Sequence, residues 1–184
     1  MSQPAPTYAA MRANYPAKAD GMDKDRLFKL IGWEALIEDI DYHNTCATRM
    51  SIALLGAGFS FPGRMRINAG PLKGRRVEPG QARLSTILAQ PQYLGPPEKF
   101  KMAQATEVGI GRRMGIVSFF QLDATDPTNR QGHMDLVAPE NGGPKVPRDV
   151  LPDCTRNLVL ATNVTSLPPS PLATAVARTL VQQQ

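Results

Sequence analysis

Residues 44–54 of this chain read NTCATRMSIAL, and this stretch is the clearest local signal in the sequence. Two side chains that can cap a helix stand at its start, Asn44 and Thr45, and glycines follow at positions 56 and 58, where a helix would end. Apolar residues recur between these ends at helical spacing: Ala47, Met50 and Leu54. The pattern predicts a helix over residues 45–55 with Cys46 in its first turn.

The elements around this stretch run from helices to strands. Apolar spacing predicts further helices over residues 24–40, after Pro79 with positions 84, 87 and 88 facing inward, and near Pro97 with Phe100 and Met102. Beyond position 109 the hydrophobic pattern changes from helical to extended. It predicts strands over residues 115–120, 133–137 and 158–161. Helices followed by strands are typical of an α+β domain rather than of alternating βαβ units.

We divide the chain into three parts on composition. Residues 1–22 are rich in proline and alanine and lack a period, so we expect a flexible N-terminal arm. One folded domain is expected over residues 23–165. Residues 166–184 form a C-terminal tail that begins with prolines and can close with a helix over residues 172–181.

Composition narrows the possible classes of protein. The chain has 184 residues, 42% of them hydrophobic, which suits one domain with a real core. Two cysteines exclude a disulfide-rich fold and a four-cysteine zinc site, and we expect neither a metal nor a cofactor. The net charge of +5 favours an anionic partner. We expect no membrane span and no signal peptide, and therefore a chain made in the cytoplasm.

Cys46 is the first candidate for chemistry. In the first turn of a helix, free backbone N–H groups and the positive end of the dipole favour a thiolate, which is the nucleophilic form of the side chain. The backbone N–H of Cys46 could also bind an oxyanion at the same helix start. The alternative is a small buried helix residue, since free cysteine is among the most buried residue types.

His133 is the candidate general base. It begins a predicted strand directly after Gly132, where an imidazole can point into a cleft. An exposed turn residue is the alternative, and His43, three residues before Cys46, is our second choice of base.

A third group should orient the imidazole. Asp135 lies two residues beyond His133 on the same strand face, whereas Asp149 and Asp153 lie in the Pro/Gly-rich connection to the next strand. Each of them could instead be an ordinary turn or loop residue.

Five basic residues lie among glycines and prolines between positions 60 and 80: Arg64, Arg66, Lys73, Arg75 and Arg76. They lack the interleaved aromatic residues that stack on nucleic-acid bases. We interpret this segment as a solvated basic loop. The second interpretation is that it binds a polyanion.

Two stretches of the sequence, the one around Cys46 and the one around His133, resemble a known family. NTCATRMSIAL is similar to the nucleophile helix of the fourth family of type VI secretion amidase effectors, and GHMDL at residues 132–136 is similar to its histidine strand. The strand GIVSFF at residues 115–120 and the segment NYP at residues 14–16 stand in the order that this family shows. The resemblance covers roughly residues 12–138.

The resemblance implies a papain-like cysteine peptidase of the NlpC type, with the nucleophile helix packed on an antiparallel sheet and the amidase domain over residues 23–165. It implies Cys46 as nucleophile and His133 as base. The family has an aspartate after the histidine strand, often flanked by cysteines. Asp149 has about the expected spacing and is our choice, with Asp153 second, and Cys154 is the one cysteine in that segment.

The function implied is that of a secreted antibacterial effector. Such proteins cleave peptidoglycan stem peptides between D-glutamate and diaminopimelate in the periplasm of a rival cell, and a cognate immunity protein blocks the site in the producer. Export through secretion machinery fits a chain without a signal peptide, and we expect no nucleic-acid partner. Two alternatives stay open: a cysteine amidase acting on a protein, and a basic module that binds nucleic acid or an acidic polymer without catalysis.

Overall fold

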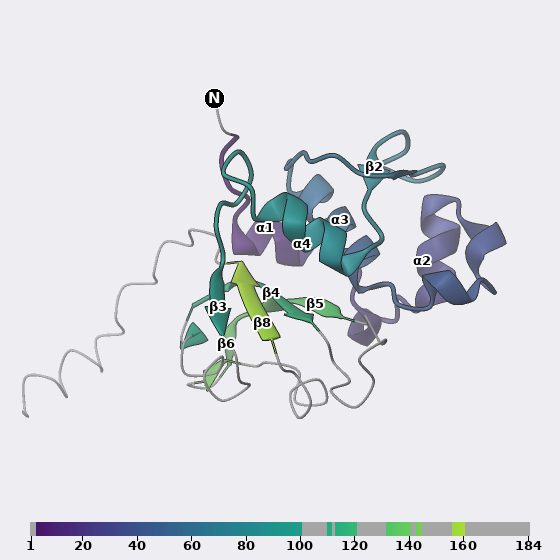
Figure 1. Cartoon of the computed structure of the whole chain (residues 1–184). Helices are drawn as coiled ribbons and strands as arrows, with labels where there is room; N and C mark the ends of the chain where they lie inside the picture. Colours follow the sequence, from purple (N-terminus) through teal and green to yellow (C-terminus); the bar gives the residue numbers. More distant parts are fainter. Residues whose placement is uncertain are drawn as a thin grey trace, which may run out of the picture.

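The computed structural model describes residues 3–100, 110–111, 113–120, 132–140, 143–144 and 156–160. Helices α1, α3 and α4 cover one face of a small sheet, and α2 stands to the side of them (Figure 1). The α+β class is therefore confirmed.

Four α-helices and three 3₁₀ turns precede the sheet. The α-helices are α1 (Tyr8–Ala13), α2 (Lys24–Ile31), α3 (Cys46–Gly56) and α4 (Gln81–Leu88), and the turns are η1 (Lys18–Asp20), η2 (Glu34–Leu36) and η3 (Ile40–Tyr42). The helix predicted over residues 45–55 is α3, and the one predicted after Pro79 is α4. The helix predicted over residues 24–40 ends early, because Gly32 takes a left-handed conformation with φ 74° and two 3₁₀ turns follow.

The strands form one four-stranded sheet and two small hairpins. The sheet is antiparallel in the order β3-β8-β4-β5, with β3 (Glu98–Phe100), β4 (Gly115–Phe120), β5 (His133–Val137) and β8 (Arg156–Leu160). The hairpins pair β1 (Met65–Arg66) with β2 (Arg76–Val77) and β6 (Pro139–Glu140) with β7 (Gly143–Pro144). All three predicted strands are present, and His133 lies on an edge strand.

The helix predicted near Pro97 was wrong. Residues 98–100 form strand β3, in which Lys99 pairs with Leu158 of β8. The hydrogen-bonding partner comes from a distant part of the chain, so tertiary pairing overrides the local apolar spacing.

The flexible arm expected over residues 1–22 was also wrong in its central part. Helix α1 is capped by Thr7, whose hydroxyl accepts a hydrogen bond from the N–H of Ala10, and Met11 is fully buried in the core. The helix packs against α3 so closely that a side chain at Gly56 would collide with Asn14. The remaining domain boundaries stay predictions, because the residue at 165 and the tail over residues 166–184 lie outside the described part of the chain.

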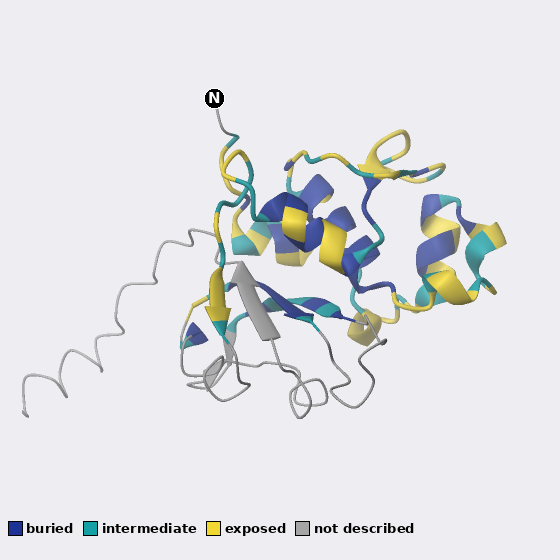
Figure 2. Ribbon diagram, in the orientation of Figure 1, coloured by how far each residue is buried: buried dark blue, intermediate teal, exposed yellow. Residues whose placement is uncertain are grey.

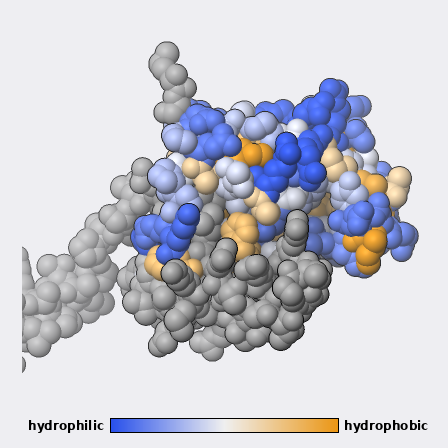
Figure 3. Space-filling model, viewed as in Figure 1, coloured by the Kyte–Doolittle hydropathy of each residue, from blue (hydrophilic) through white to orange (hydrophobic). Residues whose placement is uncertain are grey.

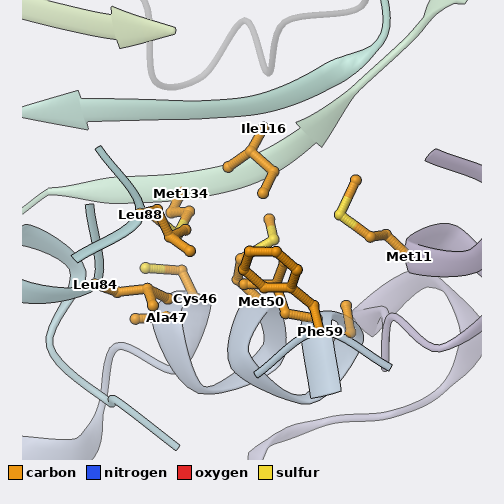
Figure 4. Close-up of a cluster of buried hydrophobic side chains, with 11 residues drawn as sticks. Met11, Cys46, Ala47, Met50, Phe59, Leu84, Leu88, Ile116 and Met134 are labelled. Atoms are coloured by element: carbon orange, nitrogen blue, oxygen red, sulfur yellow. The ribbon is translucent and has the colours of Figure 1, made fainter. Parts of the chain in front are cut away.

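Helix α3 is the centre of the core. Ten of its eleven residues are buried, as its dark blue ribbon shows in Figure 2. It lies between α1, α4 and the sheet, and the side chains of one cluster converge there from all of these elements (Figure 4). Burial on every side holds the helix, and with it Cys46, in one position.

The basic segment over residues 60–80 contains more structure than we expected. Hairpin β1–β2 lies within it, and Arg64 pairs with the fully buried carboxylate of Glu78 at 2.8 Å. Arg76 donates a hydrogen bond to the carbonyl of Arg64. Part of this positive charge is therefore used inside the fold.

The described surface in Figure 3 is mostly hydrophilic, with scattered apolar side chains. Leu30 and Ile40 are the exposed large hydrophobic residues in the described ranges. No helix in the described ranges is both long and apolar enough to span a bilayer.

Candidate active site

The start of α3 is tied directly to the start of β5 by one side chain. The amide of Asn44 accepts a hydrogen bond from the Cys46 N–H at 3.1 Å through Oδ1, and donates one to the Gly132 carbonyl at 2.8 Å through Nδ2. Asn44 and Gly132 are 88 positions apart in sequence. Asn44 thus holds the start of α3 against the residue that precedes His133.

Gly132 has no room for a side chain. A Cβ there would lie 2.6 Å from the Phe119 carbonyl oxygen and 2.1 Å from Oε1 of Gln81. Only glycine therefore allows β5 to begin so close to β4 and α4.

Cys46 lies in the first turn of α3 and is 6% exposed. Its side chain belongs to the buried cluster and lies beside Met134 at the end of the helix nearer the sheet (Figure 4). Little of Cys46 is therefore open to solvent.

His133 is placed by its neighbours on β4 and β5. It pairs in register with Phe119, and the two rings are stacked at 6.4 Å between centroids with an interplanar angle of 15°. Burial lowers the pKa of His133, but contacts with the side chains of Asp135 and Cys46, together with their charges, outweigh this and raise the pKa to about 9. These contacts favour the protonated form of the imidazole.

Asp135 lies on the same strand face as His133. Its Oδ2 is 3.8 Å from Nε2 of His133, and its Oδ1 accepts a hydrogen bond from the Leu136 N–H at 2.7 Å. Tyr15 also hydrogen-bonds to this carboxylate, and burial followed by the charge of Asp135 raises the pKa of Tyr15 above its ordinary value. The carboxylate is thus held between a phenol and an imidazole.

Arg49 lies on α3, one helical turn after Thr45, and interacts electrostatically with this phenol and this carboxylate. Its Nε donates to the Thr45 hydroxyl at 2.9 Å and its Nη1 to the Met22 carbonyl at 2.7 Å, with Pro16 as a further carbonyl partner. Nη2 is buried and has no hydrogen-bond partner in the described ranges. Burial lowers the pKa of Arg49, while the charges of Tyr15, Asp23, Asp135 and Cys46 act in the opposite direction.

A thiol at a helix start, an imidazole in contact with it and a carboxylate next to the imidazole form an arrangement that can carry out nucleophilic attack on an amide. The comparison with protein-family models agrees with this geometry: the model described as type VI secretion system (T6SS), amidase effector protein 4, matches residues 42–161. The chain belongs to this family. A search of curated proteins gave no match.

Members of the amidase effector family are antibacterial peptidoglycan hydrolases delivered by type VI secretion. Peptidoglycan and the secretion machinery are therefore partners at the level of the family. The match includes Cys46, His133 and Asp135 but leaves out residues 1–41, so Tyr15 and the first two helices of this amidase effector lie outside it.

The structure brings together Cys46 and His133, as the sequence indicated, and adds Asp135, which the sequence left open. Asp149, our choice for the orienting carboxylate, lies outside the described residues, as do Asp153 and Cys154. His43 is exposed, and the described structure shows no hydrogen bond between its side chain and Cys46.

Three polar residues of the site were missed from sequence: Asn44 as a bridge, Tyr15 and Arg49. Arg49 did leave a signal, since a charged residue within the apolar stretch over residues 46–55 is unusual unless it has buried partners. Tyr15 left none, because its contact with Asp135 depends on how α1 packs.

A hollow of about 450 Å³ lies next to Thr45, the residue before Cys46. Its wall is formed by the segment around η1, the start of α2 and His43. The described residues contain no group of three or more histidines, cysteines and carboxylates that could hold a metal ion.

Proposed function

We propose that this amidase effector cleaves peptidoglycan stem peptides with Cys46 as nucleophile and His133 as general base and acid. One observation supports the proposal above all: α3 and β5 place the thiol against an imidazole that Asp135 contacts from its Nε2 side. The depth of Cys46 agrees with an extended peptide as substrate.

The reaction follows from the protonation states. The thiol proton passes to a neutral His133, which gives a thiolate and an imidazolium, and the raised pKa of His133, about 9, favours this pair. The thiolate forms a bond to the amide carbon, and His133 returns the proton to the departing amine. A water molecule then attacks the thioester, gives a proton to His133, and releases the carboxylic acid and the thiol.

Asp135 is the orienting carboxylate in this proposal. With its Oδ2 facing Nε2 of His133, the other ring nitrogen is the one that exchanges a proton with Cys46. Asp149 and Asp153 remain competitors, and the variants Asp135→Asn, Asp149→Asn and Asp153→Asn distinguish the three. The residue whose loss lowers turnover most strongly is the orienting group.

The backbone N–H of Cys46 is the proposed oxyanion donor. It now donates to Asn44 Oδ1 at 3.1 Å, so it has to exchange this bond for one to the substrate oxygen. The exchange gives Asn44 a second function at the site, as the group that satisfies the donor between turnovers.

The finer identity of the reaction is also proposed: cleavage between D-glutamate and diaminopimelate, in the periplasm of the target cell, with a cognate immunity protein that covers the site. A cysteine amidase acting on a protein would share the Cys46–His133 chemistry. A basic binding module would need neither residue.

Incubation of the purified protein with peptidoglycan, with the products identified by mass, tests the proposal. We expect new amino and carboxyl termini at the D-glutamyl–diaminopimelate bond, and none from a folded Cys46→Ala variant, which loses only one sulfur atom from the core. Cleavage of a protein but not of peptidoglycan would support the first alternative. If the parent protein and Cys46→Ala both bind peptidoglycan and neither cleaves it, the result would support the basic binding module.

A further inference from the structure

The hollow beside Thr45 has a strongly cationic wall. Lys18 from η1 and two residues from the first turn of α2, Lys24 and Arg26, line it, together with the single carboxylate of Asp23. That carboxylate is partly occupied, because its Oδ1 accepts a hydrogen bond from the Arg26 N–H at 2.8 Å. The hollow therefore carries more positive than negative charge.

Two of the three cations keep hydrogen-bonding capacity for a ligand. The Lys18 ammonium is exposed and makes no hydrogen bond or ion pair in the described structure. Arg26 uses Nη1 to bond the Gly21 carbonyl at 2.9 Å, which leaves Nη2 and Nε. Lys24 is more firmly held, since its Nζ bonds the Asp39 carbonyl at 3.3 Å and lies over the Phe28 ring.

The hollow is adjacent to the reactive centre. Thr45 lines it and directly precedes Cys46, and consecutive Cα atoms are about 3.8 Å apart. The chain that forms its wall continues from Tyr15, which contacts Asp135, and from Met22, whose carbonyl accepts a hydrogen bond from Arg49. The same segment thus supports the active site on one side and forms the hollow on the other.

We propose that this hollow binds a free carboxylate of the peptide substrate, with Lys18 and Arg26 as the ligands that recognise it. The inference rests on the proposed function, in which both residues joined by the scissile bond carry a free carboxylate. An extended peptide advances about 3.3–3.6 Å per residue, so a carboxylate next to an amide held at Cys46 comes within reach of the hollow. His43 also lines the hollow.

Kinetics on a pair of murein peptides, one with free carboxylates and one with the carboxylate nearest the scissile bond amidated, test this assignment. We expect Lys18→Gln to raise KM for the free peptide about tenfold with little change in kcat, because a charged hydrogen bond is lost. Lys18→Gln with Arg26→Gln should raise it further. For the amidated peptide, the parent protein and the variants should have similar KM values.

Lys29→Gln is the matched control, since Lys29 is exposed on α2, does not line the hollow and carries the same charge. Equal KM values for Lys18→Gln and Lys29→Gln would overturn the assignment. Calorimetric titration of the free peptide into Cys46→Ala and into Cys46→Ala with Lys18→Gln measures binding without turnover. If the parent protein cleaves no peptide, the proposed function fails, and a difference in these two titrations still decides whether the hollow binds the carboxylate.

Discussion

Two buried charged groups lie on opposite sides of α3, and they are satisfied to different degrees. Glu78 is completely buried, yet its carboxylate pairs with Arg64 and Arg83 and accepts the Gly80 N–H at 2.9 Å. Arg49 is also buried, but its Nη2 has no partner in the described structure, and its charge acts on Tyr15, Asp135 and Cys46. A fully paired charge stabilises the fold, whereas an incompletely paired one beside reactive groups indicates a site.

The largest effect should come from Asp135, the carboxylate on the Arg49 side. We expect Asp135→Asn to lower turnover by about 10³–10⁴-fold, because an amide neither stabilises the imidazolium nor selects the correct tautomer. Burial lowers the pKa of His133, and Asp135 and Cys46 together raise it to about 9, so loss of Asp135 should also move the alkaline limb of kcat/KM to lower pH. Rates measured from pH 6 to 10 test both effects, and an unchanged limb would show that another group holds His133.

The same pKa shift links pH to folding. The pKa of His133 rises from 6.5 to about 9 in the folded protein, so the stabilisation is complete below about pH 6.5 and disappears as the pH rises toward 9. We expect urea midpoints of the parent to decrease over this window more than those of Asp135→Asn. Parallel curves for the two proteins would contradict this linkage.

Glu78→Gln should affect stability and leave the chemistry intact. The substitution removes the charge that faces Arg64 and Arg83, and both arginines are half-exposed and can be hydrated, so we expect a loss of about 2 kcal/mol in the free energy of unfolding. Activity per folded molecule should match that of the parent. A lower kcat in a fully folded sample would remove the distinction between the two sides of α3.

Arg49→Lys should give a smaller effect on both properties. Lysine keeps the charge but cannot bond Thr45, Pro16 and Met22 at once through a planar fork. We expect kcat to fall about tenfold and the melting temperature to fall by a few degrees. Circular dichroism during thermal unfolding measures the loss of stability, and initial rates measure the loss of activity. A parental kcat would assign Arg49 to the fold alone.

The smallest effect should come from Asn44→Ala. Loss of the bridge leaves the Gly132 carbonyl and the Cys46 N–H without their partner, at a cost of about 1 kcal/mol, typical of a lost helix cap. We expect a modest decrease in kcat with KM unchanged. A rise in KM alone would assign Asn44 to substrate binding.

The sequence predicted the parts of this molecule that local pattern controls. The capping residues and apolar stripe of α3 and the alternation in β4 and β5 predicted these elements correctly, whereas the roles of Cys46 and His133 stay predictions. Strand β3 was missed because Lys99 pairs with a residue far along the chain, and α1 because it is short and is stabilised by tertiary packing of Met11.

The orienting carboxylate shows where reasoning from the residues and from resemblance differ. The separation of two between His133 and Asp135 already placed both on one strand face, yet the family pattern favoured the later Asp149. The contact at 3.8 Å supports the nearer residue. Its second partner, Tyr15, could not be found from sequence, because the packing of α1 on α3 brings it there.

The Asn44–Gly132 bridge bears on the stage of folding at which Cys46 and His133 come together. It joins residues 88 positions apart, so the loop between them has to close, at a cost in conformational entropy, before the bond can form. A nascent or threaded chain that has made α3 but not yet docked β5 has a cysteine and no histidine beside it. If Cys46 and His133 act together as proposed, we expect no activity from the partly folded chain until β5 docks against the start of α3.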